Sequence, residues 1–260
     1  SIDPRNFDIF LNGKEIKIFV SGESDGSFDA SDFIEFVGKR NDGSLDQRLY
    51  GSSENHTNPY ESLYADSSVY YLTWSSTASL NHLTNYQDPN FVGKSKDDYF
   101  MYTSIISFKD DYFDGVPNNN DAKQTFSEYT IGEGFTSGRS NTFKQFSIET
   151  PSVYSAGPDA SLELLQLTRN NPKEVFNGFN HGFAIAIGSK TDILDTYYHN
   201  GYSSKLFKFS DLQFSNSKLS SITKLFLGEV DVVNRPLSYY TIPYIKLRYP
   251  RSFDLGSTSL

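Results

Sequence analysis

Cysteine is absent from this sequence of 260 residues. Disulfide bonds, thiolate–zinc sites and a cysteine nucleophile are therefore excluded within it. No apolar run approaches the roughly 20 residues that a membrane-spanning helix needs. The sequence begins at Ser1 without a charged and then apolar leader, so we expect that any signal peptide was removed or was never included. We interpret the chain as a piece of a longer exported protein.

Runs of lysine or arginine are also missing, and the formal net charge is −9. A chain with this charge repels a nucleic-acid backbone, because it cannot replace the counterions of the phosphates. Nucleic acid is therefore excluded as a partner, and we expect no direct membrane span.

Sequence motifs of common catalytic sites are missing as well. There is no G-x-S-x-G elbow, H-E-x-x-H helix, P-loop or G-x-G-x-x-G fingerprint. The four histidines are too widely spaced to form a local metal-binding pair. His181 precedes the apolar run Phe183–Ile187, so we interpret it as a turn histidine that leads into a buried strand. With 32 acidic residues, no pair of carboxylates stands out as a glycosidase site. We expect no catalytic residue in the chain.

Aromatic residues are abundant, with 22 Phe and 18 Tyr, and they favour pleated, half-buried strands. Asn12-Gly13 is typical of a two-residue hairpin turn between strands at 8–11 and 15–20. The dense run Val69–Trp74 predicts a strand buried on at least one face, whereas residues 97–108 fit a helix or a strand. Further strands are predicted at 33–37, 144–149, 161–168, 182–188, 206–209, 224–227 and 244–249, with a loop at 114–121.

These elements predict an all-β fold. We expect a small N-terminal β domain in residues 1–80, followed by an antiparallel, jelly-roll-like β-sandwich in residues 81–260. The polar stretch at 75–96, which is rich in Ser, Thr and Asn, marks the boundary.

An acidic loop lies in the stretch VSGESDGSFDASDFIEF, Val20–Phe36. Its oxygen-bearing side chains fall at positions 1, 3, 5, 7, 9 and 12 of a twelve-residue calcium loop, and Gly26 falls at position 6, where a sharp turn is needed. The register resembles that of a dockerin loop. The predicted ligands of a structural Ca²⁺ ion are Glu23, Asp25, Ser27, Asp29 and Asp32, with Ser21 at position 1.

Two features of the same loop favour a simple turn. Position 1 is Ser instead of Asp, and Phe33–Phe36 has the sequence of a strand where the calcium motif has a helix. In this alternative Gly26 permits a tight turn, Asp29 or Asp32 caps backbone N–H groups, and Phe28 anchors the loop in the core. We interpret the loop as a turn first and as a metal site second.

Three segments, in this order, resemble a known protein region. They are SGESDGSFDASDFIEFVGKRNDG (21–43), NPYESLYADSSVYYLTW (58–74) and YIKLRYPRSFDLG (244–256). They are similar to the region ahead of the peptidase domain in gingipain-type cysteine peptidases of Bacteroidetes, which include the sortases of the type IX secretion system. TIGEGFTSGRSNTFKQFSIETPSV and NGFNHGFAIAIG are similar to sandwich strands of the same region.

The resemblance implies a non-catalytic part of a proteolytic enzyme. A domain with catalytic His and Cys would follow Leu260, and no catalytic residue of the family has a matching position in this chain. The parent would be exported to the cell surface, the outer membrane or the periplasmic face of a Gram-negative bacterium, where it processes secreted cargo. The implied partners are the downstream peptidase domain, other type IX components and cargo.

A carbohydrate-binding module of a secreted surface protein is the alternative. Sugars stack on exposed aromatic rings, and the candidate ligand residue is Trp74. The tyrosine pairs 70-71, 197-198 and 239-240 are further candidates. The competing interpretation is that most of these rings fill the core.

Overall fold

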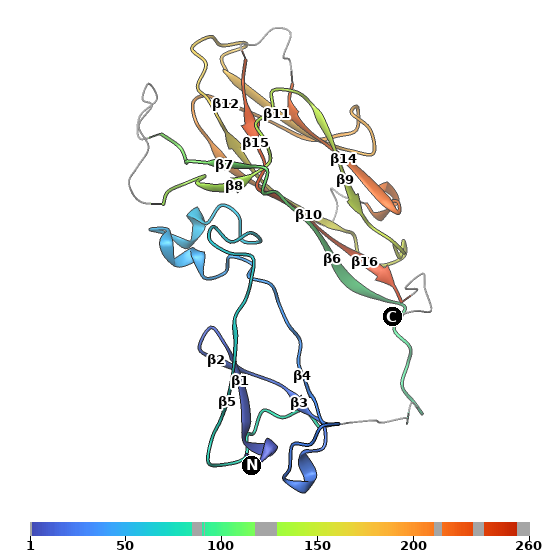
Figure 1. The fold of residues 1–260 in the computed structure, drawn as a ribbon. Helices are drawn as coiled ribbons and strands as arrows, with labels where there is room; N and C mark the ends of the chain where they lie inside the picture. Colours follow the sequence, from blue (N-terminus) through green and yellow to red (C-terminus); the bar gives the residue numbers. More distant parts are fainter. Residues whose placement is uncertain are drawn as a thin grey trace. The chain divides into compact units, whose positions relative to one another are not determined.

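The computed structural model describes residues 2–84, 90, 92–117, 129–210, 215–230 and 237–253. Within these residues the regular elements are β-strands and short 3-10 turns, so the all-β prediction is confirmed (Figure 1). None of the helical segments in this part of the chain has the length and apolarity needed to cross a membrane.

The chain folds into two compact units, each made of two separate stretches. Unit 1 contains residues 1–42 and 64–95, and unit 2 contains residues 43–63 and 96–260. This division differs from the predicted boundary after residue 80. The segment after Trp74 stays with unit 1 because Ser79 N donates to Arg5 O at 2.8 Å and Leu83 N donates to Ile18 O at 2.6 Å.

Unit 1 is built from small antiparallel sheets. One has the order β2-β1-β5, and β3 pairs with β4 in another. Asn12 and Gly13 have φ values of 51° and 74°, and they join β1 to β2 in the predicted two-residue turn. The strand predicted at 15–20 is interrupted between β2 and β3. The elements are η1 Pro4–Asn6, β1 Phe7–Leu11, β2 Lys14–Ile16, β3 Phe19–Val20, η2 Glu23–Asp25, β4 Ile34–Glu35 and β5 Tyr70–Trp74.

Strand β5 lies at the edge of its sheet. The prediction that Val69–Trp74 is buried on at least one face is wrong. Tyr71, Leu72 and Trp74 are 66%, 52% and 57% exposed. Leu72 lies opposite Ile9, and Trp74 lies opposite Phe7. Ile9 and Phe7 are themselves buried, but the core of unit 1 is too small to extend over the outer strand. A dense β run identifies a strand, but it does not show whether that strand lies at an edge.

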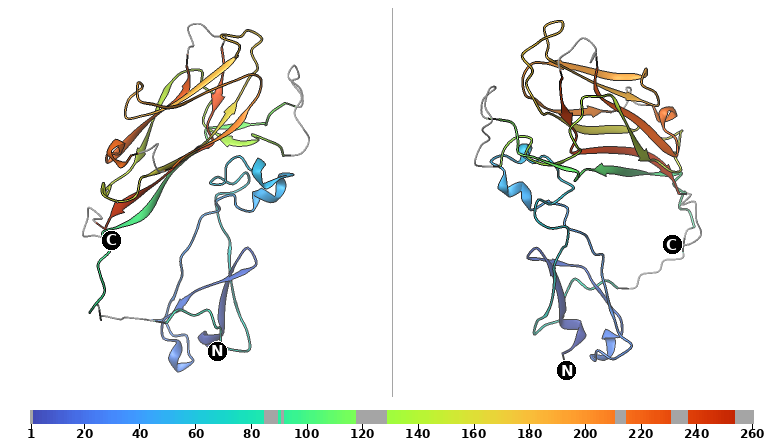
Figure 2. Two further views of the ribbon diagram at one scale, coloured as in Figure 1. Left: turned by 180° about the vertical axis from the view of Figure 1, so that it is seen from behind. Right: turned by 45° about the horizontal axis from the view of Figure 1, so that its top comes forward.

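Unit 2 contains a β-sandwich of two antiparallel sheets. Their orders are β13-β10-β16-β6, with β15 beside β10, and β12-β11-β14-β9. Figure 2 shows the two sheets face to face from two further sides. The strands are β6 Tyr99–Ser107, β9 Lys144–Glu149, β10 Ser161–Thr168, β11 His181–Ile187, β12 Ile193–His199, β13 Ser204–Phe209, β14 Ile222–Glu229, β15 Tyr240–Thr241 and β16 Tyr244–Ser252.

Other elements of unit 2 complete the architecture. The ambiguous residues 97–108 form a strand, β6. The pair β7 Asp111–Phe113 and β8 Gly134–Thr136 was not predicted, and neither were β12 and β15. Residues 118–121 of the predicted loop lie outside the described residues. The 3-10 turns are η3 Asp46–Leu49, η4 Ser53–Asn55 and η5 Asn216–Lys218.

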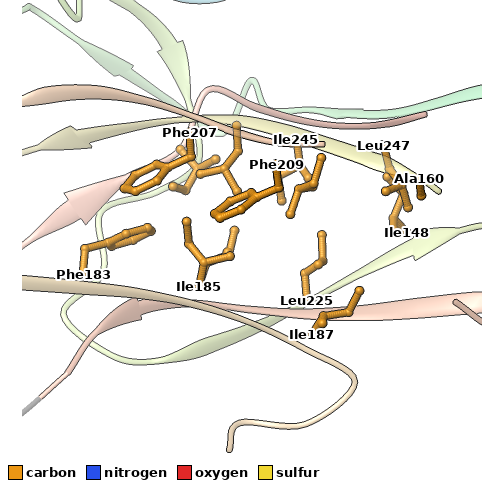
Figure 3. Close-up of a cluster of buried hydrophobic side chains, with 14 of the residues drawn as sticks. Ile148, Ala160, Phe183, Ile185, Ile187, Phe207, Phe209, Leu225, Ile245 and Leu247 are labelled. Atoms are coloured by element: carbon orange, nitrogen blue, oxygen red, sulfur yellow. The ribbon is translucent and has the colours of Figure 1, made fainter. Parts of the chain in front are cut away.

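The sandwich core is filled by alternate residues of facing strands (Figure 3). Burial of these apolar side chains is the main stabilising contribution to unit 2. One sheet contributes Phe183, Ile185, Ile187 and Leu225, and the other contributes Phe207, Phe209, Ile245 and Leu247.

Candidate functional site

The acidic loop connects β3 to β4 and is closed at its base by the backbone. Ser21 N donates to Phe33 O at 2.9 Å, which continues the β3–β4 ladder by one bond. The turn itself contains η2, and it begins and ends at Gly22 and Gly26, each with φ near 77°. Positive φ at both positions lets the chain reverse within a few residues. The predicted sharp turn at Gly26 is confirmed.

Gly22 has a second reason to be glycine. A Cβ atom at this position would lie 2.0 Å from Asp32 Oδ1, so the carboxylate occupies the space that any side chain would need. Asp32 in turn accepts a hydrogen bond from Asp29 N at 2.7 Å. The predicted capping role of Asp32 is therefore confirmed, and Gly22 makes it sterically possible.

The other loop carboxylates also bind groups of the loop. Asp25 Oδ1 accepts a hydrogen bond from Ser27 N at 2.8 Å. Asp29 Oδ1 accepts a weaker one from the Ser27 hydroxyl at 3.4 Å. Phe28 packs edge-to-face on Phe7 with 5.4 Å between ring centroids, but it remains 41% exposed, so it anchors the loop only in part.

Glu23 contacts His82, 59 residues along the chain. Its Oε2 lies 2.5 Å from His82 Nδ1, and His82 Nε2 lies 2.8 Å from Phe7 O. A carbonyl oxygen only accepts, so Nε2 carries a proton; Nδ1 faces a second acceptor. The contacts from Glu23 to His82 and from His82 to Phe7 O link the loop to β1. The sequence pattern contained no signal for this long-range contact.

The predicted calcium ligands are not gathered into a metal site in the described loop. In the part of the chain that the structure describes, no group of three or more His, Cys, Asp or Glu residues is arranged to hold a metal ion. Glu23 bonds to His82, and the carboxylates of Asp25 and Asp32 accept from loop backbone. The geometry supports the turn interpretation, and calcium binding stays a prediction.

The aromatic candidates do not form flat platforms in pairs. Neighbouring residues of a strand point to opposite faces, which separates Tyr70 from Tyr71 in β5 and Tyr197 from Tyr198 in β12. Tyr70 packs on Phe36 at 5.0 Å between ring centroids, whereas Tyr71 is exposed. Tyr240 is 1% exposed. Trp74 is exposed, and it lies three residues from Tyr71, so these two rings face opposite sides of β5.

His181 in unit 2 is fully buried as the first residue of β11. Its ring stacks on His199 at 4.6 Å between centroids, and its Nδ1 contacts the Ser238 hydroxyl. Ser238 is only 4% exposed. This serine–histidine contact is closed to a substrate, so we interpret it as part of the polar end of the sandwich interior. The core strand predicted after His181 is confirmed, but His181 is the buried first residue of that strand and not a turn residue.

Comparisons with known proteins add little beyond the fold class. No family model matches the chain, and no curated protein matches it. One similar solved structure is the carbohydrate-binding module CBM36 in complex with calcium and xylotriose, with 8% identity over 55% of this chain and 98% of that chain, and a TM-score of 0.29. Another is the CBM36-1 domain of a multidomain xylanase from the hindgut metagenome of Trinervitermes trinervoides, with 13% identity over 57% and 96%, and a TM-score of 0.30. These matches carry no functional argument.

Proposed function

We propose that this chain is the non-catalytic β region that precedes the peptidase domain of a gingipain-type cysteine peptidase, of the kind represented by PorU, the type IX secretion sortase. The observation that supports the proposal is structural, and it concerns the three segments that resemble the gingipain-type region. In each of the three segments, the distinctive residues are engaged in holding the fold.

The first segment supplies the closed loop of unit 1. Gly22 makes room for the Asp32 carboxylate, and Glu23 is bound to His82. These contacts use the acidic residues for structure, as expected of a scaffold segment that a family retains for folding.

The second segment supplies a buried cross-link in unit 2. Asn58 is 2% exposed, and its side-chain amide donates to Phe108 O, Phe135 O and Pro243 O, each at 3.1 Å. Its Oδ1 accepts from Tyr60 N at 3.2 Å. One side chain thereby satisfies backbone groups from four parts of the chain, which explains why 43–63 belongs to unit 2.

The third segment supplies β16, which lies between β10 and β6 within its sheet. Tyr249 is fully buried, and its hydroxyl donates to Pro151 O at 3.1 Å. Interior strands of this kind are needed for the sandwich to form at all. The described part of this segment, up to residue 253, is therefore scaffold as well.

In this proposal the chain itself is not an enzyme. The parent is a cysteine-type endopeptidase that processes secreted cargo at the cell surface, and the β region positions cargo or the catalytic domain. The carbohydrate-binding alternative would need a surface other than the tyrosine pairs.

The coding sequence that follows Leu260 is the first test. We expect a domain with catalytic His and Cys, and a reading frame that ends near Leu260 would overturn the proposal. A second test uses the parent enzyme with and without residues 1–260. We expect cargo processing to fall while reaction of the catalytic Cys with a small active-site probe is retained. Unchanged cargo processing would contradict a positioning role.

A further inference from the structure

The outer face of the β13-β10-β16-β6 sheet carries a basic depression in a chain that is acidic overall. Its volume is about 350 Å³. We use the name basic depression for this hollow, which is lined by Leu162 and Phe209 and by the polar residues Ser161, Glu163, Lys208, Ser210, Lys246 and Arg248. These described residues include three cations and one carboxylate.

The strand register explains why these side chains meet. Lys208 and Lys246 lie directly opposite Glu163 on its two neighbouring strands, and Arg248 lies opposite Ser161 one row further along. Directly opposed residues point to the same face of a sheet. With about 4.8 Å between strands, the two lysine backbones are about 10 Å apart, and Arg248 is about 7 Å from Lys246 along β16. The cations therefore surround an area the size of one sugar residue.

The internal charge pairing in the basic depression is incomplete. Lys208 Nζ and Lys246 Nζ lie 3.6 and 3.8 Å from the Glu163 carboxylate, which are ion-pair distances and too long for hydrogen bonds. Arg248 is exposed, and among the described residues its guanidinium forms no ion pair or side-chain hydrogen bond. The hollow therefore has a surplus of positive charge and an Arg side chain whose donors are available to an anion.

The hollow also offers groups that recognise hydroxyls. Glu163 accepts a hydrogen bond from the Tyr244 hydroxyl at 3.2 Å, and a carboxylate has room for further donors. Ser161 and Ser210 add hydroxyl groups at the rim. A ligand that suits this set carries an anionic group for Arg248 and the lysines together with hydroxyls for Glu163 and the serines.

We propose that the basic depression binds an acidic carbohydrate, with the sugar carboxylate held by Arg248 and Lys246 and a sugar hydroxyl donating to Glu163. An acidic peptide such as poly-glutamate would meet the same repulsion from Glu163, but it lacks the hydroxyl groups that a sugar offers to this carboxylate and to the serines. This proposal rests on sheet geometry and does not depend on the peptidase parent.

The test measures binding of the purified chain to an oligogalacturonate by calorimetry. A neutral xylo-oligosaccharide of equal length and a poly-glutamate peptide serve as comparison ligands. We expect saturable binding of the oligogalacturonate, weaker at higher ionic strength, and little binding of the neutral sugar. Arg248→Gln should weaken binding about tenfold, the effect of losing one charge-assisted hydrogen bond. Lys224→Gln, an exposed lysine on the other sheet, should leave it unchanged.

Glu163→Gln separates a sugar from other anions. The substitution should weaken oligogalacturonate binding, because a neutral amide accepts a hydrogen bond from a sugar hydroxyl less strongly than a carboxylate does. It should strengthen poly-glutamate binding, because it removes a negative charge that repels the peptide. Stronger binding of both ligands would overturn the sugar assignment. The proposal also fails if the oligogalacturonate does not bind, if the neutral sugar binds equally well, or if Arg248→Gln has no effect.

Discussion

The two units are stabilised in different ways. In the described part of the chain, the core of unit 2 contains sixteen buried residues from both sheets, whereas the core of unit 1 contains four. Unit 1 adds polar contacts around its acidic loop, namely the hydrogen bond from Asp29 N to the Asp32 carboxylate and the contact between Glu23 and His82. The difference teaches that the same β-rich composition can be stabilised mainly by burial or mainly by turns. Substitutions in the two units should therefore have different effects.

Matched isoleucine truncations should show the largest difference. Ile185 in unit 2 is 0% exposed between two sheets, and Ile9 in unit 1 is 5% exposed under a partly open sheet. We expect Ile185→Ala to cost about 4 kcal/mol and Ile9→Ala about 2 kcal/mol, because only the open site can relax around its cavity. Urea unfolding measures both, since Trp74 fluorescence reports on unit 1 and circular dichroism on the sandwich. Equal costs would contradict the comparison.

Asn58→Asp should cause the next largest loss of unfolding free energy. The isosteric carboxylate would face three carbonyl oxygens that now accept from the amide. We expect a loss of about 3 kcal/mol from unit 2, because the oxygen that replaces the amide nitrogen would be a buried, charged acceptor facing three other acceptors. Urea unfolding followed by circular dichroism is the measurement. A stability within error of the parent chain would show that the cross-link is dispensable.

Alkaline pH should affect unit 2 through its buried tyrosines. Burial raises the pKa of Tyr240 above its ordinary value, so the folded state keeps a proton that the unfolded state loses above about pH 10. Stability is unaffected below that pH and then falls by about 1.4 kcal/mol per pH unit for this group. The Tyr240→Phe variant lacks the hydrogen bonds of the hydroxyl group and should be less stable at neutral pH. Above about pH 10 its stability should fall less steeply than that of the parent chain. An identical decline would show that Tyr240 does not contribute.

Gly22→Ala tests the turn of unit 1. The added methyl group would collide with the Asp32 carboxylate, and the positive φ would be strained. We expect a loss of about 2 kcal/mol, visible in Trp74 fluorescence during urea unfolding. Gly13→Ala is the matched control, because Gly13 also has a positive φ but no atom lies within 4 Å of the position that its Cβ would take. If both variants lose the same amount, the collision is irrelevant.

Addition of calcium should have the smallest effect on thermal stability. The loop carboxylates already accept hydrogen bonds from the loop, so we expect the thermal midpoint to be the same in excess calcium and in chelator. A saturable rise that Asp25→Asn abolishes would establish the calcium site and contradict the turn interpretation.

Local patterns allowed much of the fold to be predicted. Asn12-Gly13 defined the first hairpin, and the apolar run after His181 identified β11, because both signals depend on neighbouring residues. Burial of β5 was predicted incorrectly, since the run Val69–Trp74 does not reveal an edge position. The partner of Glu23 could not be predicted either, because His82 is distant in sequence.

The boundaries of the units could not be predicted either, because they depend on contacts between residues that are far apart in sequence. Residues 43–63 belong to unit 2, and the Asn58 side chain binds them to it. The carbonyl groups that accept from Asn58 lie up to 185 residues away in the sequence. The basic depression arises from the register of β10 with β13 and β16, and that register is a property of the folded sheet.

We propose that this chain is a scaffold and that catalysis belongs to another domain of the parent protein. Incubation of the purified chain with a peptide library, followed by mass spectrometry, tests it most directly. We expect no cleavage above the buffer control. Cleavage that Ser238→Ala or His181→Ala abolishes in a folded variant would contradict the claim, because it would show that the buried serine–histidine contact acts on a substrate.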